Sequence, residues 1–483
     1  MDSSSGRDRV PIGRVLLLVL ESLPRPPSQP SANRVNQAPP DRVSFSTLVI
    51  YSLPAAAVGF TFMLTGTYLV KYAAEALLIG PGIMGTLWGL SRIWDAISDP
   101  IVGHLSDRTN SKLGRRRVWI LYSPIPICLG FAMMWLPPPS LEGTSLVIWM
   151  GVSVFFYFTA TTIFSVPHEA LAAEISLDHH ERTRVFGIRT GVQQIGSFLA
   201  LGALFLVAAS ESKRETLTWI VIASSLLTVV TTFWAVHRVA ERSDHQGRGG
   251  ASLMKSFRDV SKNPHAARLF TLFFIENFGT GSLMVLIPFV FHYVFDLEKQ
   301  FPLFMGLYFV SALLFIPLWI RLSREIGKKR LWLFSMATMA VGYCALFFVH
   351  ESNMGLIYVV AFVVGVGGGC ANVVGPSVQA DVIDFDEYLT GNRKEGAYFA
   401  VWNFVKKSGF GVAAMLTGLV LSGVGFVPNQ AQSEETLLAM RVLFSFVPGL
   451  CFVIGTILFI SFELDEARHA EVRRALDERN LSR

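Results

Sequence analysis

The chain has 483 residues, of which 52% are hydrophobic and only 16% are charged, and its mean hydropathy is +0.46. Because a soluble protein carries about 25% charged residues, this composition excludes an ordinary soluble globular protein. It predicts an all-α polytopic protein embedded in a lipid bilayer. The net charge of +5 is concentrated in a few loops, which indicates membrane topology and no nucleic-acid partner. The four cysteines lie in apolar segments without metal-ligand spacing, so we interpret them as packing residues.

Residues 1–44 differ from the rest of the chain, because they are polar and rich in proline, serine and arginine. Their one apolar patch, 15–20, is too short to span a bilayer. The patch lacks a small-residue cleavage motif, so we expect no signal peptide. Either this segment is a disordered cytoplasmic tail or the start site has been assigned too early.

Apolar runs that are long enough to cross a membrane recur along the remaining sequence. They begin near residues 47, 81, 118, 145, 186 and 217, and again near 269, 303, 331, 355, 396 and 438. They predict about twelve helices in two six-helix bundles, 45–240 and 266–465. A polar middle loop at 241–265 joins the bundles, and a cytoplasmic tail at 466–483 follows the second one.

Basic residues accumulate in alternate loops, which is the pattern that orients membrane proteins. One set of loops contains clusters such as Arg108–Arg117 and Arg324–Arg330, whereas the opposite loops contain only Lys213, Arg214 and Lys299. The positive-inside rule therefore predicts a multi-pass protein of the cell membrane with both termini in the cytoplasm.

The loop after the second span has a shorter counterpart after the eighth span. The first reads GHLSDRTNSKLGRRR (103–117) and the second IRLSREIGKKR (320–330). Parallel six-helix repeats with this loop are typical of the major facilitator superfamily. The acids and bases near these loops are candidates for a cytoplasmic gate, although solvated loops that only fix the topology are an equal alternative. The candidate gate residues are Asp107, Arg108, Arg115, Arg116, Asp381 and Asp384.

Asp95 and Asp99 are the most informative residues, because they lie one helical turn apart inside the second apolar span. Residues at i and i+4 share one face of a helix, and a rise of about 1.5 Å per residue puts both near the middle of the bilayer. Ionisable residues at this depth mark ion pathways, proton relays or buried pairs. Arg92 can neutralise one of the two carboxylates but not both, so we favour an ion site.

Ser98 and Thr162 are candidate hydroxyl ligands for the same site. A hard cation such as sodium suits a site made of oxygen atoms, which makes Asp95 and Asp99 candidate metal ligands. A proton is the alternative, because two like charges this close are costly to keep ionised together.

Further polar and aromatic side chains fall within the spans, and each has a structural alternative. His168 and Glu169 follow Pro167, which permits a helix break, but they could instead pair with a nearby arginine. Glu276 is a lone acid that either lines the pore or bonds to its own backbone, and Trp402 either stacks on a sugar ring or packs in the core. The candidate substrate-binding residues are Ser165, His168, Glu169, Arg189, Glu276 and Trp402.

Four runs between residues 47 and 465 resemble the glycoside–pentoside–hexuronide:cation symporter family, whose best-known member is the melibiose permease. They read RIWDAISDPIVGHLSDRT, SVPHEALAAEISLDHHERTR, ADVIDFDEY and VGFVPNQAQS. The resemblance implies two six-helix bundles that transport a sugar or glycoside together with sodium or a proton by alternating access. It also implies a small-molecule substrate and no cofactor besides the coupling ion. An intramembrane enzyme that uses Glu169 with His168 is disfavoured, because the chain lacks a nucleophile with its base, metal-ligand spacing such as HExxH and a phosphate loop. We expect the protein to be a monomer.

The resemblance further implies roles for individual residues. It assigns the cation site to Asp95, Ser98, Asp99 and Thr162, places Lys406 beside that site, and gives Arg189 a contact with the substrate. The positions of two sugar-binding aspartates are occupied here by Gly59 and Ser165. The absence of these carboxylates argues against a melibiose specialist. A lysophospholipid or another amphiphile, which relatives in the wider superfamily carry, is therefore the alternative substrate.

Overall fold

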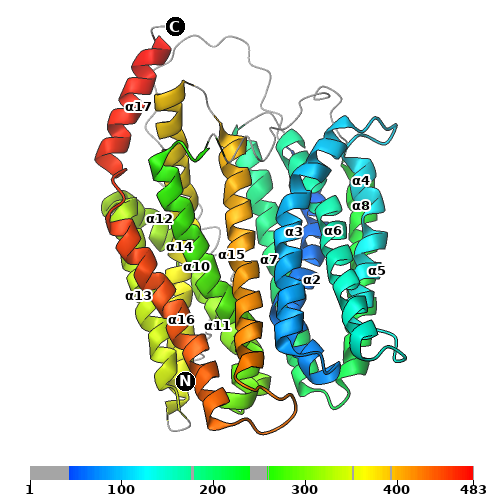
Figure 1. The fold of residues 1–483 in the computed structure, drawn as a ribbon. Coiled ribbons are helices and arrows are strands. Elements are labelled where there is room, and N and C mark those ends of the chain that lie inside the picture. The colour runs from blue at the N-terminus through cyan, green and yellow to red at the C-terminus, as the bar shows by residue number, and fades with distance from the viewer. Residues whose placement is uncertain are drawn as a thin grey trace, which may run out of the picture. The chain divides into compact units, whose positions relative to one another are not determined.

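The computed structural model describes residues 43–175, 179–239, 258, 260–350, 353–391 and 394–481. All regular elements of this described part are helices, which confirms the predicted all-α class (Figure 1). Residues Arg42–Arg483 form one unit by their internal contacts. The predictions for the N-terminal tail up to residue 42 and for most of the middle loop lie outside the described residues.

The N-terminal bundle is built from the helices between residues 45 and 238. They are α2 (Phe45–Ala76), α3 (Pro81–Arg108), α4 (Arg117–Tyr122), α5 (Pro124–Trp135), α6 (Gly143–Ile175), α7 (His179–Ala209) and α8 (Lys213–Arg238). The helix α6 continues through Pro167, so the helix break that this proline permits does not occur.

The C-terminal bundle contains the helices between residues 264 and 460, followed by one polar helix. Its first part is α10 (Pro264–Phe289), the π-helix η2 (Val290–Val294), the 3-10 helix η3 (Glu298–Gln300), α11 (Phe301–Leu314) and α12 (Ile316–Glu325). Its second part is α13 (Lys328–Ala345), η4 (Leu346–Phe348), α14 (Gly355–Thr390), α15 (Glu395–Gly423) and α16 (Glu434–Ile460). The expected C-terminal tail contains the helix α17 (Glu466–Leu481), which packs on α14.

The number of membrane-crossing helices agrees with the sequence pattern in the described part of the chain. Ten helices there are long and apolar enough to span a bilayer, and α11 with α12 makes one further span that is bent by 44°. The bend coincides with Pro317, which has no backbone N–H to donate. The remaining expected span is α3, whose 28 residues include Arg92, Asp95 and Asp99, and these charges lower its hydropathy.

Two ends of the bundles are distinguished below. The basic end is the one at which α3 finishes at Arg108 and α13 begins at Lys328, and the opposite end is the one at which α2 finishes and α3 begins. The two bundles meet along α3 and α15, which lie side by side and antiparallel (Figure 1).

Glycines let α3 and α15 approach closely in the half of each helix that is nearer the opposite end. A Cβ atom on Gly89 would lie 2.3 Å from the carbonyl oxygen of Gly411, and one on Gly418 would lie 2.2 Å from that of Pro81. No side chain fits in such a space, which is why small residues are enriched where membrane helices cross. These contacts hold the bundles together in that half and fix how α15 is rotated toward α3.

Candidate functional site

A cavity of about 240 Å³ lies between the bundles, beside the acid pair. Four helices of the N-terminal bundle and α15 of the C-terminal bundle form its walls. The lining residues are Ala55, Val58, Phe62, Arg92, Asp95, Asp99, Tyr157, Thr161, Phe164, Ser165, Val166, Glu169, Arg189, Gln193, Asn403 and Lys407. The predicted acid pair therefore borders an internal polar space and does not face lipid.

Asp95 and Asp99 point toward one common place on the face of α3, as their spacing predicts. The hydroxyl of Thr162, from α6, hydrogen-bonds to Oδ1 of Asp95 and lies 3.2 Å from Oδ1 of Asp99. Ser98 Oγ lies 3.3 Å from the same hydroxyl. The four residues predicted to form a cation site are thus brought together, and their atoms offer the oxygen ligands that sodium prefers.

A lysine from the other bundle joins the two carboxylates. The Nζ atom of Lys407 lies 2.8 Å from Oδ2 of Asp95 and 2.6 Å from Oδ2 of Asp99. The assignment of this position to Lys406 is wrong by one residue. Successive residues of a helix are about 100° apart around its axis, so only one of the two adjacent lysines can face α3. Lys406 is exposed and does not line this cavity, and the carboxylate of Glu276 in the C-terminal bundle interacts with it electrostatically.

The charges around the acid pair sum to zero without any bound ion. Arg92 Nη1 lies 3.1 Å from Oδ2 of Asp95, and its guanidinium also stacks at 4.6 Å on the ring of Phe158. Arg92 and Lys407 together balance Asp95 and Asp99. Sequence reasoning weighed Arg92 alone against the two acids and left the lysine of the distant helix out of this charge balance.

Arg189, Glu169 and His168 form a second polar group beside the cavity. Arg189 donates from Nη2 to Oε1 of Glu169 at 2.8 Å and from Nε to Nδ1 of His168 at 3.2 Å. Because Nδ1 accepts this bond, Nε2 of His168 carries the proton and donates to the carbonyl oxygen of Tyr51 at 2.9 Å. His168 is fully buried and is not part of the cavity wall. It orients the guanidinium, whereas Arg189, Glu169 and Ser165 reach the cavity.

Glu276 and Trp402 do not lie at this cavity, contrary to their assignment as substrate-binding residues. Glu276 is buried inside the C-terminal bundle, next to Gly455 of α16. Trp402 is buried against Phe273, with the ring centroids 3.9 Å apart. The rotation of α10 and α15 turns both side chains away from α3. Trp402 therefore packs in the core of the C-terminal bundle and does not line the cavity.

Asp107, Arg116, Asp381 and Asp384, four of the candidate gate residues, form contacts with residues of their own half of the chain. Arg116 pairs with Asp107 and also donates to Ser106 Oγ at 2.9 Å. The acids of α14 pair with bases of the C-terminal bundle. Asp381 lies 2.7 Å from Lys328 Nζ and Asp384 lies 3.1 Å from His469 Nε2 of α17, while Arg108 is exposed at the end of α3. A gate between the bundles at the basic end stays a prediction.

Sequence reasoning missed Asn403 and Gln193 as cavity residues and chose Lys406 of the two adjacent lysines in place of Lys407. The signal for Lys407 was present, because Asn403, Lys407 and Gly411 follow one another at intervals of four residues and therefore share one helix face. The glycine marks this face as the one that approaches another helix closely.

Comparisons with known proteins agree with this architecture. The family model described as MFS/sugar transport protein matches residues 50–466. An uncharacterized symporter, YnaJ, of Bacillus subtilis is 25% identical over 91% of this chain and 96% of its own length. The isoprimeverose transporter of Lactiplantibacillus pentosus is 26% identical over 88% and 90%. The sodium-dependent lysophosphatidylcholine symporter 1 of Xenopus tropicalis is 22% identical over 93% and 92%.

The fold is similar to that of solved transporters. The crystal structure of a D-xylose–proton symporter superposes with a TM-score of 0.60 at 15% identity, covering 86% of this chain and 97% of the other. The family match covers most of the chain and agrees with the resemblance of its motifs to the glycoside–pentoside–hexuronide:cation symporters. The chain therefore belongs to the MFS/sugar transport protein family, whose members are membrane transporters and not enzymes.

Proposed function

We propose that this secondary transporter carries a sugar or glycoside together with a sodium ion or a proton, by alternating access of the cavity to the two sides of the membrane. The observation that carries the proposal is the acid pair at the cavity wall, which Lys407 of the other bundle bridges. An ion that binds there competes with Lys407 for the carboxylates and so weakens a contact between the bundles. The basic end faces the cytoplasm by the positive-inside rule, and the protein acts as a monomer in the cell membrane.

The coupling follows from charge balance at Asp95 and Asp99. When Lys407 withdraws, the two carboxylates and Arg92 leave one net negative charge in a partly dehydrated place, which is unfavourable. A sodium ion or a proton restores neutrality there. The ammonium and the coupling ion therefore compete for the same oxygens, and the ion releases α15 from α3 at this point. Because coupling is reciprocal, ion and substrate raise each other's affinity equally.

The polar groups of the cavity support a hydroxylated substrate. Arg189 and Gln193 offer donors, and Glu169 offers acceptor oxygens. The family name and the isoprimeverose carrier among the relatives agree with such a substrate. A carboxylate at position 59 cannot take part, because a Cβ there would lie 2.3 Å from the carbonyl oxygen of Gln193. Sugar recognition must therefore differ from that of melibiose-type permeases.

An amphiphile such as a lysophospholipid is the second candidate. A separate cavity of about 180 Å³ lies inside the C-terminal bundle, between α10, α11, α13 and α14. Its walls are almost entirely apolar, with side chains such as Leu283, Met284 and Phe304. Such walls suit a hydrocarbon chain and offer a sugar few hydrogen bonds. The sodium-dependent lysophosphatidylcholine symporter among the relatives supports this alternative.

One experiment distinguishes the two candidates. The purified full-length protein is screened for thermal stabilisation by sugars, glycosides, uronates and lysolipids, each with and without sodium at two pH values. Stabilisers are then tested for accumulation in proteoliposomes with an imposed ion gradient. We expect a glycoside to stabilise the protein more strongly in the presence of the coupling ion. Stabilisation and transport of lysolipids alone would favour the amphiphile, and a chemically altered product would contradict transport.

A further inference from the structure

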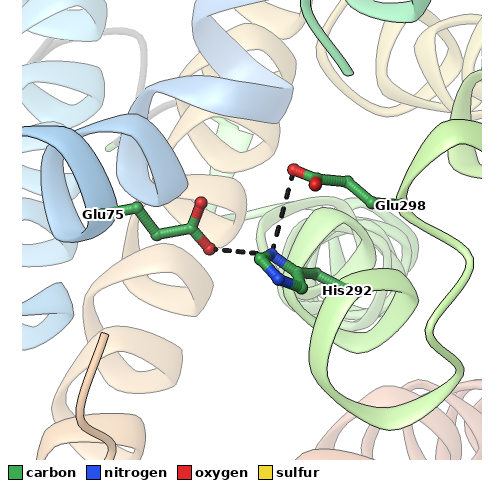
Figure 2. Close-up of side chains that lie close together, drawn as sticks. All are labelled: Glu75, His292 and Glu298. Carbon is green, nitrogen blue, oxygen red and sulfur yellow. Dashed lines mark ion pairs between the residues drawn. The ribbon is translucent and has the colours of Figure 1, made fainter. Parts of the chain in front are cut away.

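A cluster of charged side chains joins the two bundles at the opposite end, far along the helices from the acid pair. Figure 2 shows the imidazole of His292 between the carboxylates of Glu75 and Glu298. Its Nδ1 atom lies 3.2 Å from Oε1 of Glu75 and 3.8 Å from Oε1 of Glu298. Glu75 is at the end of α2 in the N-terminal bundle, whereas His292 and Glu298 belong to η2 and η3 in the C-terminal bundle.

Two lysines of the N-terminal bundle complete the cluster. The side chain of Lys71 is fully buried, and its Nζ lies 2.8 Å from Oε2 of Glu75 and 2.6 Å from Oε1 of Glu298. Lys213, at the start of α8, lies 2.9 Å from the same oxygen of Glu298. One carboxylate of the C-terminal bundle is thus held by two ammonium groups of the N-terminal bundle. A buried charge without a partner is strongly unfavourable, so the ammonium group of Lys71 can stay buried only while these carboxylates pair with it.

The backbone around the cluster has two unusual features. His292 lies in a π-helical turn, a geometry that is rare and occurs frequently at functional sites. Asp296 has a φ of +53°, which is uncommon for a residue with a side chain. These features allow both His292 and Glu298 to reach α2 from one short segment. Unusual backbone conformations persist only where surrounding contacts stabilise them, and the ion pairs of the cluster are such contacts.

The charge balance argues against a resident metal ion at this place. One ligand atom each from Glu75, His292 and Glu298 lie within 4.8 Å of one another, a spacing that a metal ion could accept. However, Lys71 and Lys213 already neutralise the two carboxylates. A divalent cation would add two positive charges beside a buried ammonium group. We therefore interpret the cluster as ion pairs between the bundles and not as a metal site.

We propose that Lys71, Glu75, Lys213, His292 and Glu298 form a latch that closes the transport pathway at the opposite end and must break when the cavity opens there. The inference rests on the proposed alternating access. Opening that end separates Glu298 from Lys71 and Lys213, while Lys71 keeps its partner Glu75 on the same helix. The latch therefore stabilises the conformation in which α3 and α15 are in contact at this end, and weakening it increases the population that is open there.

Hydrogen–deuterium exchange of the full-length protein tests the latch without any substrate. Glu298→Gln removes the charge that the two lysines share. We expect backbone amides of 81–89 in α3 and 411–423 in α15, remote from the mutation in sequence, to exchange about fivefold faster or more. Lys213→Gln should act in the same direction. The matched control is Glu325→Gln, which breaks an exposed ion pair with Arg321 inside one helix and should leave exchange at the opposite end unchanged.

Two outcomes would overturn the proposal. One is unchanged exchange in Glu298→Gln and Lys213→Gln, or faster exchange confined to residues 290–300, since that pattern means local fraying and no separation of the bundles. The other is protection of this end by added zinc that disappears in His292→Ala, because it would identify a metal site. Neither outcome depends on which substrate is transported, so a failure of the latch is distinguishable from a failure of the proposed function.

Discussion

Lys407 and Asp99 form the contact that connects the ion site to the relative positions of the bundles. The ammonium nitrogen lies 2.6 Å from Oδ2 of the carboxylate, across the interface between α15 and α3. An ion pair within one bundle would not change when the bundles separate and the cavity opens. Because this pair joins both bundles, anything that displaces the lysine changes the free energy of their contact.

The acid pair should be essential for coupling and dispensable for folding. Asp95→Asn and Asp99→Asn each remove one charge and keep the size of the side chain. We expect transport stimulated by an ion gradient to fall to background in proteoliposomes, while each protein is still expressed and purified as a monodisperse sample. Glu142→Gln, an exposed acid in a loop, is the control that should transport normally. Normal ion-dependent accumulation in both asparagine variants would disprove the assignment.

The two adjacent lysines should differ in their effects on ion binding. Lys407→Gln leaves one net negative charge among Asp95, Asp99 and Arg92, so we expect the ion to bind about tenfold more tightly, equivalent to ~1.4 kcal/mol. The transport rate should nevertheless fall, because no ammonium group remains to displace the bound ion and release it. Lys406→Gln should change ion affinity little. Titration of thermal stability with the coupling ion measures both values, and equal effects of the two substitutions would contradict the geometry.

The acid pair could be predicted from the sequence, because its spacing and its apolar surroundings are local properties of one helix. The choice between Lys406 and Lys407 depends on the rotation of α15, which the contact at Gly411 with α3 determines. The same kind of rotation turns Glu276 and Trp402 into the C-terminal bundle. Gly411 marks one face of α15 in the sequence, but which helix that face meets is not a local property of the segment, so sequence reasoning located the site but misassigned residues on α10 and α15.

The pairing of Arg189 with both Glu169 and His168 should make this arginine sensitive even to a conservative change. Lysine has a compact ammonium group and cannot donate to two partners in the fork-like geometry of guanidinium. We expect Arg189→Lys to reduce the initial transport rate roughly tenfold, which corresponds to ~1.4 kcal/mol. Arg184→Lys is the matched control, because Arg184 forms an ion pair with Glu181 three residues away and is more exposed. Equal rates in both variants would show that the bidentate contact is unimportant.

Replacing a glycine at the contact between α3 and α15 should destabilise the protein, whereas replacing a helix glycine that has open space around it should not. A Cβ on Gly89 meets the carbonyl oxygen of Gly411 at 2.3 Å, so Gly89→Ala must push two backbones apart. We expect it to lower the thermal stability of the purified protein, by about 1–3 kcal/mol in unfolding free energy. Gly202→Ala in α7 has open space around the new methyl group and should be neutral or slightly stabilising, since alanine favours helix more than glycine does. Equal stability of the two variants would mean that the helices are farther apart than the structure places them.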